Sequence, residues 1–147
     1  MKLEASIIPL GHLHSVVPDI IPLLKKSEFW ASNRVSVDDL LGFLFSNKMQ
    51  LWVVYNPDDA RIYAHLMTEY RDYPRKKILV VQYCAGDYGS LEGAEEQVHQ
   101  KLEQFAKYSG CAGIEFFGRP GWRSNAKKHG YTVQTVVYEK HFDGEQL

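Results

Sequence analysis

The spacing of apolar residues changes along the chain, and the changes predict where strands and helices lie. Between residues 50 and 85, apolar runs are separated by the turn sequences Asn56-Pro57-Asp58-Asp59 and Asp72-Tyr73-Pro74-Arg75. The runs predict strands at residues 50–56, 61–70 and 77–85. Connections this short predict an antiparallel meander, and the last run is apolar on both faces, as is typical of a central strand.

Apolar residues at spacings of three and four predict helices on either side of this meander. In the segment 36–48 the pattern follows Ser36, and Asp39 completes a sequence typical of a capping box. In the segment 91–109 the apolar stripe ends before Gly110, a residue typical of the position after a helix. A third pattern covers residues 12–28. Because Pro22 would lie inside it, a short or kinked helix is expected there.

Shorter patterns complete the expected order. Residues 2–9 and 112–117 predict strands, residues 118–130 a turn with a short helix, and residues 131–142 a last alternating strand. The order β-α-α-β-β-β-α-β-α-β predicts one α+β domain over residues 1–147, with a mixed, mostly antiparallel sheet flanked by helices. The strands at 77–85 and 112–117 are separated by a helix, so they are expected to pair in parallel or to splay apart.

Composition excludes several classes of protein. The chain has 147 residues, 45% hydrophobic and 24% charged, which is typical of one globular domain. A formal net charge of −1 argues against a broad nucleic-acid interface, although it permits a local basic patch. No apolar run approaches the roughly 18 residues of a membrane span. Glu4 lies where a signal peptide needs apolar residues, so a cytoplasmic protein is expected.

Residues that ligate metals or form disulfides show no pattern of their own. The two cysteines, Cys84 and Cys111, are too few for a disulfide scaffold and are read as reduced core thiols. The six histidines show no metal-ligand spacing with a second acid. The sequence therefore predicts no metal site.

The element order and several local sequences resemble the GNAT superfamily of N-acetyltransferases over nearly the whole chain. The meander precedes a glycine-bearing loop and a long amphipathic helix. Lys127-Lys128-His129-Gly130-Tyr131 is similar to the end of the family's last helix. Gly118-Arg119-Pro120-Gly121-Trp122 resembles divergent, often phage-encoded, members. The resemblance implies an acyl-CoA-dependent N-acyltransferase, with acetyl-CoA between the fourth and fifth strands and an acceptor amine on a small molecule or a protein.

The resemblance also selects candidate site residues. A helix N-terminus binds a pyrophosphate through its unpaired amides, and arginine binds phosphate with two parallel hydrogen bonds. The cofactor-binding candidates are Gln82, Cys84, Gly89, Ser90, Gly93, Arg119, Trp122 and Arg123. A backbone amide near Gln82 to Cys84 would polarise the thioester carbonyl. The catalytic candidates, which would exchange a proton with the reacting groups, are Tyr83, Glu69 and Glu115.

Two departures from the family pattern keep a second function open. The loop at residues 85–94 has glycines but no Arg, Lys or Gln at the family's spacing. The acids Asp87, Glu92, Glu95 and Glu96 crowd the helix start, where they would repel a pyrophosphate. Ala126 stands where the family often has a tyrosine general acid. The alternative is a catalytically degenerate GNAT-fold binding or structural module, such as a phage protein, that uses exposed aromatics and the basic residues of 119–128.

Overall fold

The computed structural model describes residues 2–87, 93–119 and 122–142. They divide into two compact units, residues 1–117 and 118–147, which are described separately. No helix among the described residues is long and apolar enough to cross a membrane.

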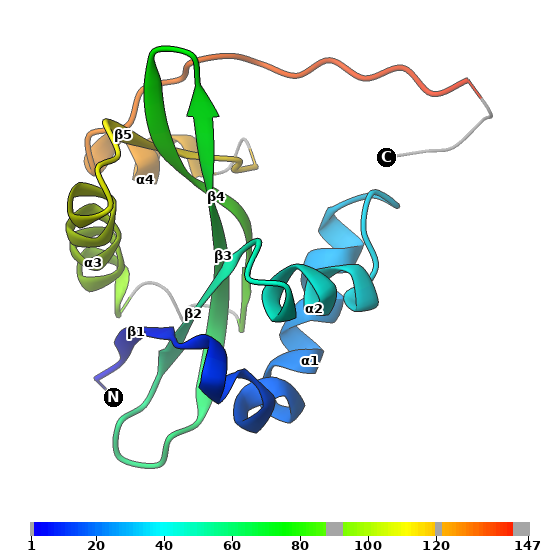
Figure 1. Ribbon diagram of the computed structural model, residues 1–147, viewed down its shortest axis with the longest axis vertical. Helices are drawn as coiled ribbons and strands as arrows, with labels where there is room; N and C mark the ends of the chain where they lie inside the picture. The colour runs from blue at the N-terminus through cyan, green and yellow to red at the C-terminus, as the bar shows by residue number, and fades with distance from the viewer. Residues whose placement is uncertain (1, 88–92, 120–121, 143–147) are drawn as a thin grey trace. The chain divides into compact units, whose positions relative to one another are not determined.

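The first unit is built on one five-stranded sheet with strand order β1-β2-β3-β4-β5 (Figure 1). The strands are β1 (Glu4–Ile8), β2 (Gln50–Tyr55), β3 (Ile62–Tyr73), β4 (Lys76–Gly86) and β5 (Gly113–Phe116). The first four strands are antiparallel to their neighbours, and β5 is parallel to β4. The predicted α+β class with a mixed, mostly antiparallel sheet is therefore confirmed, as is the meander of β2, β3 and β4.

Helices cover both faces of this sheet (Figure 1). A short 3-10 helix, η1 (Leu10–His12), leads into α1 (Leu13–Trp30), and α2 (Val37–Phe45) lies on the same face. The third helix, α3 (Glu95–Tyr108), packs against the opposite face. Leu91, with which a helix was predicted to begin, lies outside the described residues.

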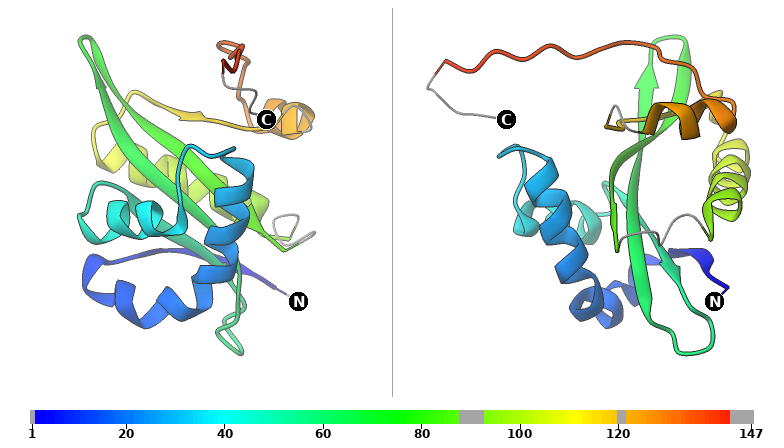
Figure 2. Two further views of the ribbon diagram at one scale, coloured as in Figure 1. Left: turned by 90° about the vertical axis from the view of Figure 1, so that its right-hand side faces the viewer. Right: turned by 180° about the vertical axis from the view of Figure 1, so that it is seen from behind.

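The first helix is longer than the sequence predicts. It runs for 18 residues with both Pro18 and Pro22 inside it, so of the two expected forms, short or kinked, it is not the short one. Pro22 has no N–H to donate to the carbonyl of Pro18, which weakens the helix at that turn. Figure 2 shows the two halves of α1 running in different directions, so the expected kink is present. The helix continues past Pro22 because Leu23 and Leu24 are buried against the sheet.

The ends of α2 and α3 have the local chemistry that the sequence predicts. The Ser36 hydroxyl accepts from the Asp39 N–H at 3.1 Å, and the Asp39 carboxylate accepts from the Ser36 N–H at 2.9 Å, which completes the capping box. Gly110 has a φ of 77°, and the N–H of Cys111 donates to the Ala106 carbonyl at 2.8 Å. This is a Schellman end, in which the left-handed residue is most easily a glycine.

Alternation along the strands divides the core between the two faces. On one face, Trp52, Val54 and residues of α3 form a buried cluster, in which the Trp52 ring meets the Phe105 ring edge-on at 5.3 Å. On the other face, Leu51 and Val53 pack against α1 and α2. The sheet is thus held between two apolar layers, and its middle strands are buried on both sides.

The second unit contains one short helix, α4 (Arg123–Lys128), which ends at Gly130 with a φ of 86°. The strand predicted at residues 131–142 is wrong, because the structure shows no strand there. Val133, Val136 and Val137 are 62%, 56% and 66% exposed. Alternating residues define the faces of a strand, but a strand also needs a neighbour for its backbone groups, and the described residues of this unit provide none.

One histidine lies at the centre of the first unit. His65 on β3 has no exposed surface, and its Nε2 lies 2.7 Å from the Ser27 hydroxyl of α1. Its Nδ1 has no hydrogen-bond partner among the described residues. Burial lowers the pKa of His65 from 6.5 to about 4, because the charged imidazolium would lose its hydration there.

We expect this histidine to make the protein less stable in mild acid. The unfolded chain binds a proton at His65 below about pH 6.5, whereas the folded chain binds it only near pH 4. Stability therefore falls as the pH falls through this window. Chemical denaturation at pH 7.5 and pH 5.0 should show a loss of about 2 kcal/mol from this group. His65→Leu should remove that part of the pH dependence, and an unchanged dependence in the variant would contradict the assignment.

Candidate functional site

Strands β4 and β5 pair over a short distance and then separate. Their register runs from Ile78 opposite Gly113 to Val81 opposite Phe116, and the Phe117 N–H donates to the Val81 carbonyl at 3.2 Å. Strand β4 continues to Gly86 with only β3 beside it. Within the described part of the first unit, no strand pairs with the other edge of residues 82–86. The predicted parallel pairing is therefore confirmed over these four pairs, and the backbone edge beyond them has no neighbouring strand in the described part of the first unit.

A β-bulge lies at the point where the strands separate. Thr68 is opposite Val81 and Met67 is opposite Tyr83, so Gln82 is an extra residue on β4. Such a bulge bends the strand and changes the direction in which its backbone groups point. Gln82 and Cys84, two of the predicted cofactor-binding residues, lie on this open stretch of β4. Gln82 is the polar residue in the otherwise apolar run from Ile78 to Ala85, but a single polar residue does not by itself indicate a bulge.

The three predicted catalytic side chains lie on the same face of the sheet, the face that also carries α1 and α2. Glu69 of β3 and Glu115 of β5 are both paired with Val80 of β4, so they flank this buried valine in one row. Two strand spacings separate their Cα atoms by about 10 Å. Tyr83 lies beyond the bulge, opposite Met67, and its half-buried ring packs against the core under α1 and α2.

Arg71 and Tyr73 join the two carboxylates in a polar network that we call the face cluster: Glu69, Arg71, Tyr73 and Glu115. Arg71 Nη2 lies 3.5 Å from Glu69 Oε1, and the Tyr73 hydroxyl donates to Glu115 Oε1 at 2.9 Å. A hydrogen bond with Tyr73 raises the pKa of Arg71, and the charges of Glu69 and Glu115 raise it further. Sequence reasoning missed Arg71 and Tyr73. Their two-residue spacing from Glu69 places them on its face and was the available signal.

The environment of Tyr83 favours its protonated form. Burial raises the pKa of Tyr83 above its usual value of 10.0, and the negative charges of Glu69 and Asp39 raise it further. Arg34, in the loop between α1 and α2, opposes this rise. Tyr83 therefore holds its proton at neutral pH, which makes it a proton donor rather than a base.

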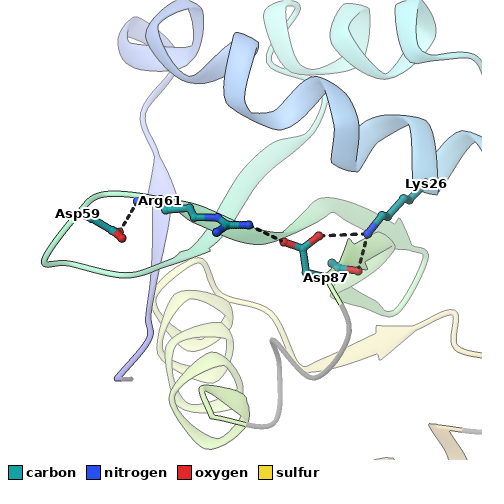
Figure 3. A network of polar contacts seen from close by, with 5 residues as sticks. Lys26, Asp59, Arg61 and Asp87 are labelled. Atoms are coloured by element: carbon teal, nitrogen blue, oxygen red, sulfur yellow. Dashed lines mark hydrogen bonds and ion pairs between the residues drawn. The ribbon is translucent and has the colours of Figure 1, made fainter.

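A second polar network fixes the end of β4 (Figure 3). The Asp87 carboxylate lies 3.2 Å from Lys26 Nζ of α1 and 3.8 Å from Arg61 Nη2 beside the β2–β3 loop. Lys26 also donates to the Gly86 carbonyl at 3.2 Å, and the Asp87 N–H donates to the Tyr63 carbonyl at 2.9 Å. Asp87, predicted to repel a pyrophosphate, is therefore compensated by two cations that are distant in the sequence.

The remaining cofactor-binding candidates are described only in part. Gly89 and Ser90, with the acid Glu92, lie outside the described residues. For Gly93, the described residues place no atom within 4 Å of where a Cβ would be. In the second unit, the Arg119 guanidinium lies 5.5 Å from the centre of the Trp122 ring, and Arg123 begins α4. Arg119 and Trp122 are therefore within cation–π distance of each other.

Several acetyltransferases are among the solved structures that resemble this chain. An aminoglycoside acetyltransferase from an uncultured soil metagenomic sample matches with a TM-score of 0.70 and 14% identity over 95% of each chain. Glucosamine-6-phosphate N-acetyltransferase from Arabidopsis thaliana matches with a TM-score of 0.66 and 14% identity. The match covers 97% of this chain and 100% of that one. A GNAT family acetyltransferase from Staphylococcus aureus matches with a TM-score of 0.65 and 11% identity, over 97% of this chain and 100% of that one. No family model matches the sequence, and no curated protein is significantly similar to it.

These similarities show that the chain has the GNAT fold, as the resemblance implied. The shared elements include the mostly antiparallel sheet with helices on both faces. At such low sequence identity the similarity concerns the fold, and the chemistry has to be argued from the residues of this chain.

The proximity of Glu69 and Tyr83 can be measured without an activity assay. Glu69→Gln removes a negative charge that raises the pKa of Tyr83, so that pKa should fall. Arg34→Met removes a cation that lowers it, so the pKa should rise. Both changes can be followed by carbon-13 NMR of labelled tyrosine rings between pH 8 and pH 12. Glu103→Gln, on an exposed position of α3, is the matched control, and an equal shift in this control would contradict the proximity.

Proposed function

We propose that the protein is an acyl-CoA-dependent N-acyltransferase that transfers an acetyl group to an amine. The observation that carries this proposal is the separation of β4 from β5 at the Gln82 bulge, with Tyr83 and Glu69 on the adjoining face. An open strand edge and two proton-transfer groups of different character meet at this point.

The open edge of β4 fits the acyl-CoA arm. Pantetheine is extended and carries amide groups, which can pair with the backbone of residues 82–86 as a neighbouring strand would. The bound thioester supplies the activated acetyl group. Backbone amides near Gln82 to Cys84 would stabilise the negative charge that develops on its carbonyl oxygen. Lys26 and Arg61 reduce the negative charge of Asp87 at the start of the loop that leads to α3.

Glu69 and Tyr83, on the face beside this edge, divide the proton transfers. Glu69 accepts a proton from the acceptor ammonium, which frees the nitrogen lone pair for attack on the thioester carbon. The new C–N bond forms as the C–S bond breaks, and the electron pair of the broken bond stays on sulfur. Tyr83, protonated at neutral pH, would donate its proton to that sulfur, and its phenolate would then take the second proton from the acylated nitrogen. Tyr83 thereby takes the role that Ala126 cannot fill on α4.

Tyr83→Phe is the variant that tests this role. We expect kcat for acetyl transfer to fall by about 100-fold, because general acid catalysis commonly contributes that much. The Kd for acetyl-CoA, measured by calorimetry, should change little, since the ring is retained. Tyr108→Phe, at a tyrosine 92% exposed on α3, is the matched control and should behave as the unmodified protein. Equal kcat values for Tyr83→Phe and the control would exclude Tyr83 as the acid.

A binding module without catalysis is the second candidate. Phe29 and Trp30, at the end of α1, are 73% and 55% exposed and lie edge to face at 5.2 Å, an arrangement suited to a protein contact. This candidate predicts that millimolar acetyl-CoA gives no heat of binding, whereas the acyltransferase predicts saturable binding.

A further inference from the structure

We propose that the acceptor is an amine with a second positive charge, a diamine or an oligoamine, and that the face cluster selects it. This inference rests on the proposed acyl transfer and names the class of acceptor. It is carried by the position of Glu115, which lies on the acceptor face of the sheet but apart from the groups at the bulge.

The arrangement of the two carboxylates gives the cluster two anionic positions. The charge of Glu69 raises the pKa of Tyr83, so Glu69 lies close enough to Tyr83 to serve the reacting amine. Glu115 lies across buried Val80, on a different strand. The cluster contains two carboxylates and one guanidinium, so its net charge is −1. A second ammonium group fits the position of Glu115.

The cation of the cluster is engaged within it. Arg71 contacts Glu69, is hydrogen-bonded to Tyr73, and lies 5.8 Å from the centre of the Phe117 ring. It is therefore poorly placed to bind a carboxylate on the acceptor. Each carboxylate has one oxygen in a contact within the cluster, and the described residues place no other hydrogen bond or ion pair on either group. The remaining oxygens can accept from ammonium groups.

Aromatic rings border the same surface. Tyr73 is 40% exposed and Phe117 is 51% exposed, and half-buried Tyr83 lies at the bulge. The faces of aromatic rings attract alkylammonium ions, and their carbon surface suits the methylene chain between two amines. Buried Ile78 and Val80 lie beneath the cluster and add no competing charge. Acidic and aromatic groups together favour a flexible oligocation over an amino acid.

Three acceptors of matched length test the proposal: 1,4-diaminobutane, n-butylamine and 4-aminobutyrate. They share one primary amine on a four-carbon chain and end in an ammonium, a methyl or a carboxylate group. With acetyl-CoA as donor, kcat/KM should fall in that order. We expect at least about fivefold between the diamine and the monoamine, the order of effect of one partly exposed ion pair. A monoamine or an amino acid used as well as the diamine would overturn the proposal.

Variants of Glu115 connect the preference to the face cluster. Glu115→Gln should raise KM for the diamine and reduce the ratio of kcat/KM between diamine and monoamine towards 1. Glu115→Lys should reverse the order of the diamine and 4-aminobutyrate. The control Glu103→Gln removes the same charge from α3 and should leave the ratio unchanged. A ratio that survives Glu115→Gln, or that falls equally in the control, would show that the cluster does not select the acceptor.

The experiment separates failure of this inference from failure of the proposed function. Transfer to all three amines at similar rates would support the proposed acyltransferase activity but reject selection of a diamine by the face cluster. If no amine is acetylated, the proposed function fails, and calorimetry with 1,4-diaminobutane then tests the inference alone. Binding that Glu115→Gln weakens by about fivefold would support it. Equal binding by both proteins, or none by either, would reject it.

Discussion

The organisation of the first unit depends on one mismatch, the unequal length of the strands on either side of β4. Strand β4 has 11 residues and β5 has 4. On its other side, β4 remains paired with β3 to its end. Strand β4 can lose a partner without unfolding because both of its faces are packed, with Leu79 and Val81 against the α3 side and Val80 fully buried. The open backbone edge is thus a consequence of the two apolar layers that hold the strand in place.

Charge is arranged around this edge in two small networks, each nearly compensated. At the end of β4, Asp87 is paired with Lys26 and Arg61, which come from two other elements. On the face that carries α1 and α2, Arg71 offsets one of two carboxylates. All these groups are partly exposed, so the networks add little to stability, and their effect is on position and local potential. The formal net charge of −1 for the whole chain conceals this arrangement.

Local sequence patterns predicted much of the fold. The meander, the capping box at Ser36 and the helix end at Gly110 depend on residues within a few positions of one another, so they could be read directly. The length of α1 could not, because tertiary packing of Leu23 and Leu24 outweighs the local cost of Pro22. The strand expected at residues 131–142 is absent for the opposite reason. The local pattern favours a strand, but the described residues of the same unit contain no strand with which it could pair.

The sequence suggested individual residues for the candidate site, and the structure adds the contacts between them. Tyr83, Glu69 and Glu115 were selected individually, and the structure places them on one face. Neither the Arg71 and Tyr73 link nor the Asp87 contacts could be read, because they depend on the pairing register and on residues up to 61 positions apart. The phosphate-loop candidates Gly89 and Ser90 remain a prediction.

The bulge at Gln82 also changes which residues of β4 point to each face of the sheet. Val81 belongs to the core beneath α3, whereas Tyr83, two residues later, packs on the side of α1 and α2. In a regular strand these two side chains would point the same way. Without Gln82, Val81 and Tyr83 would be direct neighbours, and ordinary alternation would still place them on opposite faces, but the bend in the strand would be lost. The extra residue therefore leaves Val81 and Tyr83 on the faces they would have without it and changes the course of the β4 backbone where the pairing with β5 ends.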